Sequence, residues 1–462
     1  METNGMTQHA PVTLIGAGLA GSLLAVFLAR RGIAVRAFER RPDPRGGTPG
    51  AGRSINLALS ARGIDALARV GLDRDILSIA IPMRGRMMHA VDGTRTFQPY
   101  GQRPEEVIHS VSRAELNKRL LSAAEALPSV ALHFSQRCED VDVDACGALF
   151  VDERSGEQQH VSGATVIGTD GAVSALRDAM LRRGGHRCTQ DMLEHGYKEL
   201  TIHPGPDGAF RMEADVLHIW PRSSFMMIAL PNPDRTFTCT LFLQREGDTS
   251  FDSLRDAATV RSFFAQYFPD ALALMPQLEE EFFANPTGHL GTVRVDRWHA
   301  EGKALLLGDA AHAIVPFFGQ GMNCAFEDCV ALDHAIERHG ADWARVFAEV
   351  QHRRKDNADA IADMALRNFI EMRDLVADPR FLFMKRAGLV LERHFPDYFV
   401  PMYSMVSFHL LPYATALRRG LLQQRILEQL TEGVARIEDI DLDAARRLIT
   451  ATLPPFADDA GM

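Results

Sequence analysis

No charged side chain occurs from Val12 to Ala29, and the pattern of apolar residues changes twice within and after this run. The segment VTLI at 12–15 is typical of a buried strand, and SLLAVFLARRG, after a group of glycines, is typical of a helix. IAVRAFER then returns to the pattern of a strand. The chain is therefore predicted to form a strand–helix–strand unit over residues 12–39.

Further along the chain the periodicity changes again. The segment 52–71 leads into an amphipathic helix, and a second helix opens at Ser112, where Glu115 three residues later indicates an N-terminal cap. Strand-like segments separated by proline turns fill 197–245 and predict an antiparallel sheet. GKALLLGDAAH contains one more buried strand, and from residue 325 the pattern is mainly helical.

Length and composition limit what these elements can form. With 462 residues, 46% of them hydrophobic and 24% charged, the chain can fill a large core and is expected to form two or three folding units. Its net charge of −10 argues against the concentrated basic surface that nucleic acid requires. The six cysteines form no C-x-x-C pair, which gives no support for a zinc ribbon and fits a reducing cytoplasm.

The uncharged run at 12–29 has two other interpretations, a secretory signal and a membrane span. Residues 1–11 contain neither lysine nor arginine, whereas a signal peptide begins with a basic segment. Gly16, Gly18 and Gly21 instead follow the first strand with the spacing G-x-G-x-x-G. This spacing is typical of a dinucleotide-binding turn, in which N–H groups at the start of a helix face the phosphates.

Carboxylates further along the chain indicate which dinucleotide is bound. Glu39 lies 18 residues beyond Gly21, close to the separation of about 20 at which such a side chain binds a ribose hydroxyl. Asp309, in LLLGDAAHAIVPFFGQGMNCAFEDC, ends a strand and is placed for a ribitol or ribose hydroxyl. Gly321 opens a helix whose N-terminus would face negative charge on a reduced flavin ring. Asp170, in IGTDG, could face the cofactor or cap its own turn, and both roles stay open.

The ordered set GxGxxG, GTDG and GDAAH…P…GQGMN resembles the FAD-dependent aromatic hydroxylases with the p-hydroxybenzoate hydroxylase fold. Further segments, among them FERRPDPR, SVSRAELNKRLL, HGYKEL, VLHIWP and PMYSMVSF, make the chain similar to the kynurenine 3-monooxygenases within this group. We therefore expect an α/β fold: a Rossmann-like FAD-binding domain, an antiparallel-sheet substrate domain and a C-terminal helical region. The expected boundaries are 1–190 (with a substrate-facing excursion near 80–105) and 291–375 for the FAD-binding domain, 191–290 for the substrate domain and 376–462 for the helices.

The resemblance also implies which residues contact FAD. Besides Gly16, Gly18, Gly21, Glu39 and Asp309, they are Ala20, Phe38, Arg40, Arg41, Ala58, Arg113, Cys138, Gly321, Met322 and Asn323. Arg113 follows the Ser112 cap, from which a guanidinium could reach ribityl or phosphate oxygens; a solvated arginine at a helix start is the alternative. No metal ion and no catalytic side chain are implied, because the flavin carries the chemistry.

For the substrate, the resemblance implies Arg86, Tyr100, Asn368 and Tyr403. An arginine can hold an α-carboxylate through two parallel hydrogen bonds, and tyrosine hydroxyls can add to them. Anchoring this tail places the substrate ring against the flavin without a protein contact to the reacting carbon. Arg84 and Arg86 would face the same side of one strand, so the residues alone leave the choice between them open.

The reaction implied is hydroxylation of L-kynurenine at ring C3 to 3-hydroxy-L-kynurenine with bound FAD, transient NADPH and O2, in tryptophan degradation or NAD biosynthesis. Two alternatives stay open: a flavin hydroxylase of another aromatic acid, and a non-catalytic FAD redox sensor. Eukaryotic members carry a C-terminal membrane anchor and this sequence stops without one, so we expect a cytoplasmic protein without membrane or nucleic-acid partners. Whether it forms a homodimer is left open.

Overall fold

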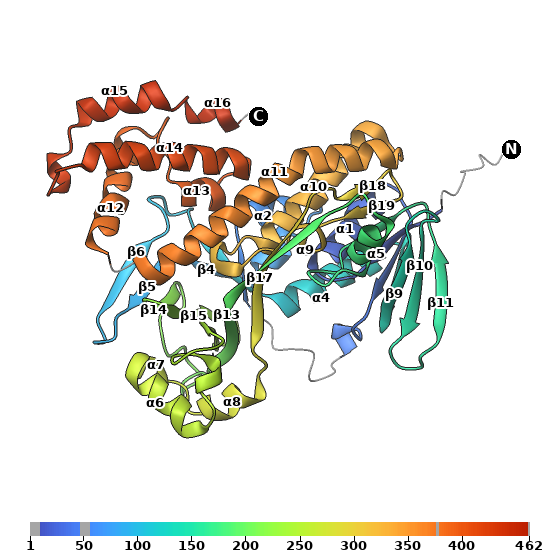
Figure 1. The fold of residues 1–462 in the computed structure, drawn as a ribbon, viewed down its shortest axis with the longest axis horizontal. Helices are drawn as coiled ribbons and strands as arrows, with labels where there is room; N and C mark the ends of the chain where they lie inside the picture. Colours follow the sequence, from blue (N-terminus) through green and yellow to red (C-terminus); the bar gives the residue numbers. More distant parts are fainter. Residues whose placement is uncertain (1–9, 47–55, 376–377, 461–462) are drawn as a thin grey trace.

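A largely parallel sheet lies at the centre of the computed structural model, which describes residues 10–46, 56–375 and 378–460. The order of its strands is β18 (His299–Ala300), β19 (Ala304–Leu306), β12 (Val166–Gly168), β1 (Val12–Ile15), β2 (Val35–Glu39) and β8 (Val130–Phe134). From β19 to β8 the neighbouring strands run parallel. The carboxyl ends of β19, β12, β1 and β2 therefore meet at one edge, where α1 (Leu19–Arg30) begins. Figure 1 shows α1 next to α10, with which it is in contact.

The predicted strand–helix–strand unit is confirmed by β1, α1 and β2. Gly16 has φ +92°, and a Cβ there would lie 2.6 Å from the carbonyl oxygen of Thr169. At Gly21 a Cβ would lie 2.1 Å from the carbonyl oxygen of Gly16. Both contacts are shorter than any real side chain allows, so glycine is what lets α1 sit directly on the ends of β1 and β12.

A second, larger sheet lies beside the first. Its strand order is β17 (Gly288–Val295), β13 (Cys188–Ile202), β16 (Phe237–Gln244), β15 (Phe225–Pro231), β14 (Leu217–Arg222), β5 (Gly85–His89) and β6 (Arg95–Pro99). The predicted antiparallel pairing holds except between β14 and β5, which run parallel. These two strands are far apart in the sequence, so no hairpin fixes their relative direction.

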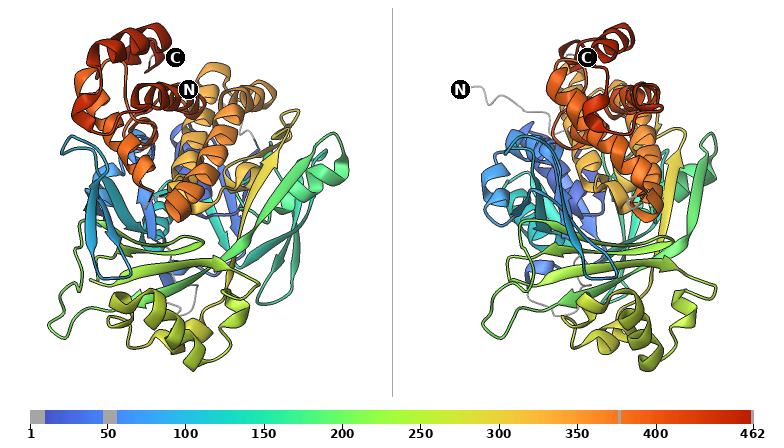
Figure 2. Two further views of the ribbon diagram at one scale, coloured as in Figure 1. Left: turned by 60° about the vertical axis from the view of Figure 1, so that its left-hand side comes forward. Right: turned by 90° about the vertical axis from the view of Figure 1, so that its left-hand side faces the viewer.

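Helices cover both sheets. Figure 2 shows α6 (Ala257–Tyr267), α7 (Pro269–Leu272) and α8 (Leu278–Ala284) on the face of the larger sheet that points away from the C-terminal helices. The first half of the chain also contains two small sheets, with the strand orders β3 (Asn56–Leu59), β7 (Ile108–Ser112), β4 (Ile81–Met83) and β11 (Gln158–Ser162), β10 (Gly147–Asp152), β9 (Gln136–Asp142). Its further helices are α2 (Ala61–Arg69), α3 (Asp73–Leu77), α4 (Arg113–Glu125) and α5 (Ala175–Arg183). Residues 52–55, the start of the segment predicted to lead into α2, lie outside the described residues.

The C-terminal part is helical, as predicted. It contains α9 (Asp309–His312), α10 (Gly321–His339), α11 (Trp343–Ile370), a π-helical turn (Glu371–Leu375), α12 (Pro379–His394), α13 (Met402–Ser407), α14 (Tyr413–Thr431), α15 (Leu442–Thr452) and α16 (Phe456–Ala460). Prolines mark the breaks, because Pro379 begins α12 while Pro401 and Pro412 immediately precede α13 and α14. In the ranges that the structure describes, no helix has the length and apolar character needed to cross a membrane.

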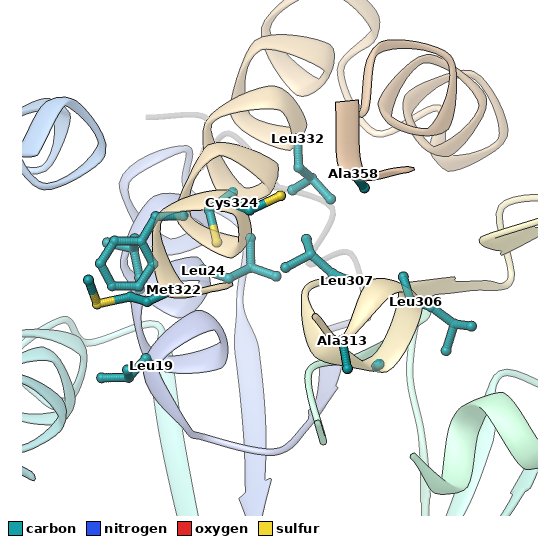
Figure 3. Close-up of a cluster of buried hydrophobic side chains, with 14 of the residues drawn as sticks. Leu19, Leu24, Leu306, Leu307, Ala313, Met322, Cys324, Leu332 and Ala358 are labelled. Carbon is teal, nitrogen blue, oxygen red and sulfur yellow. The ribbon is translucent and has the colours of Figure 1, made fainter. Parts of the chain in front are cut away.

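The main core joins α1 to the second half of the chain. Figure 3 shows Leu19 and Leu24 of α1 together with Leu306 and Leu307 at the end of β19 and with Met322 of α10. Leu24, Leu306 and Leu307 are at most 1% exposed. Burying one such side chain contributes about 1.5–3 kcal/mol, so this contact holds the N-terminal unit and residues near 306–322 in one body.

The IGTDG segment ends β12 and leads into α5. The Asp170 carboxylate accepts a hydrogen bond from the N–H of Ala175 at 2.8 Å, at the first residue of α5. The structure therefore shows that one Asp170 oxygen helps to cap α5, whose N-cap residue is Ser174, while the Oδ1 of Asp170 makes no hydrogen bond within the described residues. Burial raises its pKa from 3.8 to about 6, although the hydrogen bonds to α5 act in the opposite direction.

This raised pKa predicts a pH-dependent loss of stability. The folded state holds the Asp170 proton more tightly than the unfolded state, so this group's contribution is complete below about pH 4 and falls by about 3 kcal/mol as the pH rises from about 4 through 6. The Asp170→Asn variant should lack this part of the pH dependence of the free energy of unfolding, measured with urea. Asp178→Asn, which changes an exposed carboxyl of the same helix, should keep the wild-type profile. Parallel profiles for the wild type and Asp170→Asn would contradict the prediction.

Candidate functional site

The first feature of the site is the open N-terminus of α1. No side chain caps this helix, and its first turn contains no acidic residue. Among the described residues, a Cβ at Gly18 would meet no atom within 4 Å, so none of these residues fills the space beside Gly18. The unpaired N–H groups and the helix dipole favour an anion at this point, as a pyrophosphate would provide.

Glu39 closes one side of this space from the end of β2. Its carboxylate accepts hydrogen bonds from the N–H of Ala17 and from the N–H of Arg41, both at 3.0 Å. Arg40 and Arg41 are exposed beside it. Phe38, by contrast, is 2% exposed and stacks on Phe150 with 4.0 Å between the ring centroids, and its carbonyl oxygen accepts from the N–H of Gly16 at 2.8 Å, so its ring is not available to a ligand.

Asp309 lies near the same helix from the opposite side. It is exposed, whereas residues 304–308 and 310–313 are buried. A Cβ at Gly308, the preceding residue, would lie 3.7 Å from the Cβ of Ala20 and 3.1 Å from that of Ala325. The turn therefore lies against both α1 and α10, and the Asp309 carboxylate can accept a hydrogen bond from a ligand hydroxyl.

A buried network of charged side chains is hydrogen-bonded to the turn that carries Asp309. Asp328 accepts from the Nε of Arg354 at 2.7 Å, from the N–H of Gly308 at 3.1 Å and from the Nε2 of His312 at 2.6 Å. Burial disfavours the charged imidazole, but the Asp328 carboxylate outweighs this and raises the pKa of His312 well above its ordinary value. His312, Cys324 and Asp328 are close enough to share a metal ion, but the Asp328 carboxylate is already engaged by Arg354 and His312.

A second open helix N-terminus, that of α10, faces the site from the GQGMN segment. No side chain caps α10, and its first turn has no acidic residue. The Asn323 amide donates to the carbonyl oxygens of Ala58 at 2.8 Å and of Gly319 at 2.9 Å. Gly319 has φ +68°, and a Cβ there would lie 3.0 Å from that of Ala58. Gly321 and the buried Met322 complete this first turn, so β3 and α10 are held close together.

Arg113 lies on α4, which packs against α1, and Cys138 lies on β9, which packs against β2 and α5. Arg113 is exposed at the first residue of α4, whose Asn117 side chain accepts from the Ser22 hydroxyl of α1 at 3.2 Å. The predicted Ser112 cap of α4 is confirmed. Burial raises the pKa of the Cys138 thiol to about 12, and the nearby carboxylate of Asp170 is the second cause of this rise. The thiol therefore stays neutral and is no nucleophile at physiological pH.

A second cluster contains three of the residues expected to bind the substrate. The guanidinium carbon of Arg86, on β5, lies 4.7 Å from the ring centroid of Tyr403 on α13 and 5.4 Å from that of Tyr100, which follows β6. The two tyrosine rings stack at 5.3 Å, and Phe318 stacks on Tyr403 at 5.5 Å. Because Phe318 directly precedes Gly319, this cluster borders the α10 turn.

Two polar atoms of the second cluster are buried and make no well-formed hydrogen bond within the described residues, although the Arg86 guanidinium and the two tyrosine hydroxyls lie close enough to interact with one another. These two atoms are the Nε of Arg86 and the hydroxyl of Tyr100, a residue that is 7% exposed. Burial raises the pKa of Tyr100 well above its ordinary value and raises that of Tyr403 as well, so both hydroxyls are neutral donors. Buried polar groups are almost always paired, so these atoms indicate a place for an anionic ligand group.

The structure separates Arg84 from Arg86. Arg84 lies between β4 and β5, where its N–H donates to the carbonyl oxygen of Asp215, and its Nε contacts the Asp215 carboxylate at 2.5 Å. Its side chain is 53% exposed and covers the ring of Phe97. The expectation that both arginines share one face of a strand is therefore wrong, because the strand is interrupted at Arg84.

The hydrogen bonds of Asn368 are to residues outside the cluster of Arg86, Tyr100 and Tyr403. Its amide donates to the carbonyl oxygen of Phe317 at 2.5 Å and to the Sδ of Met372 at 3.3 Å. Phe317 also stacks on Phe369 with 4.1 Å between the ring centroids. Asn368 thus ties α11 to the Pro316–Phe318 turn, which separates the two parts of the site.

The sequence did not single out Arg62, a fully buried arginine near the site. Arg62, on α2, is 1% exposed and donates from its Nη1 to Glu327 of α10 at 2.6 Å. A possible signal for it was its place on the same helix face as the apolar Ala66, one turn later, because a charge on an apolar face needs a buried partner.

Comparison with known proteins agrees with this geometry. The family model described as FAD binding domain matches residues 9–364. Kynurenine 3-monooxygenase of Myxococcus xanthus (strain DK1622) is 54% identical over 446 residues, which cover 96% of each chain. The enzyme of the same name from Stenotrophomonas maltophilia (strain K279a) is 48% identical over 97% of this chain and 99% of its own.

Solved structures show the same fold at low sequence identity. The tetrameric form of 2-methyl-3-hydroxypyridine-5-carboxylic acid oxygenase has a TM-score of 0.64 and 19% identity, covering 81% of this chain and 95% of its own. PqsL of P. aeruginosa, in complex with 2-aminobenzoylacetate, has a TM-score of 0.62 and 20% identity over 79% and 99% of the two chains. The expected FAD-binding fold is confirmed, and the chain belongs to the FAD-binding monooxygenase family whose curated members carry the name kynurenine 3-monooxygenase.

Proposed function

We propose that this chain hydroxylates L-kynurenine at ring C3 with NADPH and O2, using bound FAD. The observation that carries this proposal is the buried cluster of Arg86, Tyr100 and Tyr403, in which a guanidinium N–H and a hydroxyl make no well-formed hydrogen bond within the part of the chain that the structure describes. Kynurenine carries an α-carboxylate and an aniline ring. The cluster offers a cation and two neutral donors for the former, and the aromatic side chains beside it can pack against the latter.

The geometry supports a division of roles between the two parts of the site. We infer that Arg86 binds the carboxylate, while the hydroxyls of Tyr100 and Tyr403 add hydrogen bonds. Asn368 acts through the Phe317 carbonyl and holds the aromatic turn that separates substrate from cofactor. With the tail of the substrate fixed in this way, its ring is oriented and shielded from water at the border of the α10 turn.

The residues present fit FAD. The N-terminus of α1 and the free space at Gly18 suit the pyrophosphate, while Glu39 and Asp309 suit ribose and ribitol hydroxyls. When bound, FAD supplies the electron transfer from NADPH and the reaction with O2. We further assign cofactor contacts to Gly16, Ala20, Gly21, Phe38 (through its main chain), Arg40, Arg41, Ala58, Arg113, Cys138, Gly321, Met322 and Asn323.

We also infer a cytoplasmic location, which the six free cysteines support. A homodimer is a hypothesis that sedimentation of the purified protein would test. The domain boundaries expected from the sequence are likewise retained as a proposal.

The proposed reaction predicts that L-kynurenine stimulates NADPH oxidation. Purified protein should show a flavin absorbance spectrum, and mass spectrometry should find a product with one added oxygen atom. Stimulation by a benzoate or phenol but not by L-kynurenine would favour a hydroxylase of another aromatic acid. Bound flavin without stimulation by any member of such a panel would favour the redox sensor.

The carboxylate role of Arg86 predicts a large effect on substrate binding. Arg86→Met should raise the KM for L-kynurenine by between about tenfold and 100-fold, because a charge-assisted pair is lost, with the FAD content unchanged. Arg84→Met is the matched control and should change KM by less than about twofold, since the contacts of this side chain, an ion pair with Asp215 and the ring of Phe97, are exposed. Equal effects of the two substitutions would contradict the assignment.

Two glycines of the first turn should respond in different ways to the same change. Gly18→Ala should leave the stability of the FAD-free protein unchanged and raise the Kd for FAD by about tenfold or more, because its methyl group enters the pyrophosphate space. Gly21→Ala should lower the free energy of unfolding by about 1–3 kcal/mol or more, because its methyl group meets the Gly16 carbonyl. Thermal unfolding and fluorescence titration with FAD measure the two effects. An unchanged FAD affinity of Gly18→Ala would contradict the placement of the phosphates.

A further inference from the structure

A fully buried arginine lies behind the helix that carries Tyr403. Arg62 is the second residue of α2 and is 1% exposed. A charge buried in this way is stable only when it is paired and hydrogen-bonded, so its partners show what it holds in place.

The guanidinium of Arg62 binds the carbonyl groups at the end of α13. Its Nε donates to the oxygen of Val406 at 2.7 Å, and its Nη2 donates to that of Met405 at 3.3 Å. The Nη2 also donates to the oxygen of Leu411, in the segment that joins α13 to α14. The last carbonyls of a helix lack partners within the helix, and a positive charge there is favoured by the helix dipole. Arg62 is therefore a C-terminal cap for α13, supplied from a distant part of the chain.

Tyr403 lies on this short helix, one turn before the capped carbonyls. Because α13 has only six residues, fixing its last turn fixes the whole helix. The ring of Tyr403 lies 4.7 Å from the Arg86 guanidinium and stacks on Tyr100. A small rotation of α13 would change the distance between the Tyr403 hydroxyl and Arg86.

On its other side Arg62 is tied to the helix that follows the GQGMN segment. Its Nη1 donates to the Oε1 of Glu327 on α10 at 2.6 Å. The ring centroid of Tyr413 lies 3.9 Å from its guanidinium carbon, and the Tyr413 hydroxyl donates to the Oε1 of Gln320 at 2.9 Å. Gln320 directly precedes α10. Arg62 thus joins α13 to the helix whose N-terminus borders the proposed flavin site.

We propose that Arg62 is a positioning residue for substrate binding. It fixes α13 against α10, so that the Tyr403 hydroxyl and the Arg86 guanidinium can both bind the α-carboxylate of the substrate. This inference rests on the proposed function, in which Arg86 and Tyr403 bind the substrate tail. Arg62 acts through Tyr403.

The test is the variant Arg62→Lys. Lysine keeps a positive charge near Glu327, but its single ammonium group cannot replace the planar fork that reaches three carbonyls. Calorimetric titration of the FAD-loaded protein with L-kynurenine, without NADPH, should show a Kd raised by about tenfold. The KM should rise by a similar factor, while kcat changes by less than about twofold and the FAD content is retained. Arg62→Gln, which keeps two N–H donors, is the second variant.

Arg419→Lys is the matched control. Arg419 is also 1% exposed and binds backbone carbonyls, those of Tyr398 at 2.6 Å and Pro454 at 3.1 Å, in the C-terminal region. This variant should lower the melting temperature and leave the Kd within about twofold of the wild type. An equal rise in Kd would show that loosening the C-terminal region is enough, and would overturn the specific role of Arg62.

A double-mutant cycle separates positioning from a general loss of structure. In a Tyr403→Phe background the hydroxyl is absent, so Arg62→Lys should raise the Kd by no more than about twofold. Additive effects would overturn the proposal, as would an unchanged Kd in Arg62→Lys or the failure of both Arg62 variants to fold. Failure of the wild-type protein to bind L-kynurenine would instead overturn the proposed function and this inference with it.

Discussion

The close approach of α1 to the ends of β1 and β12 is the constraint on which the rest of the structure depends. It is possible only because Gly16 and Gly21 have no side chain, and it leaves the first N–H groups of α1 facing open space. Once α1 is fixed there, α10 packs against it, and Leu307, which follows β19, lies beside Leu24 of α1 (Figure 3). The Asp309 turn and the GQGMN turn consequently come to the same edge of the sheet from more than 280 residues further along the chain.

The second cluster depends on a different principle, the cost of leaving polar groups buried and unpaired. Arg86 and Tyr100 come from the β5–β6 hairpin, and Tyr403 comes from the C-terminal helices. The part of the molecule that holds them together is also polar, since the Gln102 amide after Tyr100 contacts Glu392 and the Leu389 carbonyl of α12. The C-terminal helices therefore support the pocket on two sides, through Gln102 and through the carbonyls of α13.

Much of the fold, including the glycine turn and the strand that carries Glu39, could be predicted from the sequence, because the signals are local. The glycine spacing, Glu39 and the Ser112 cap depend on neighbours within a few turns, and the structure has the elements where the pattern placed them. Asp170 was ambiguous because a cap and a ligand contact require the same carboxylate after a strand. The choice between Arg84 and Arg86 could not be made, since it depends on Asp215, which is more than 120 residues away, and on the break between β4 and β5. The role of Arg62 was missed for the same reason, because its carbonyl partners lie more than 340 residues away.

The parallel pairing of β5 with β14 has a consequence for how the molecule can be divided. The larger sheet receives two of its strands from residues 85–99, which lie within the first third of the chain, while the neighbouring strands come from 188–244 and 288–295. No single contiguous fragment of the central region contains the whole sheet. An excised fragment would expose the edge of β14 where β5 belongs, and exposed strand edges associate with other chains. We therefore regard the chain from β5 to β17 as one cooperative unit, because the larger sheet is complete only when the strands from both parts of this range are present.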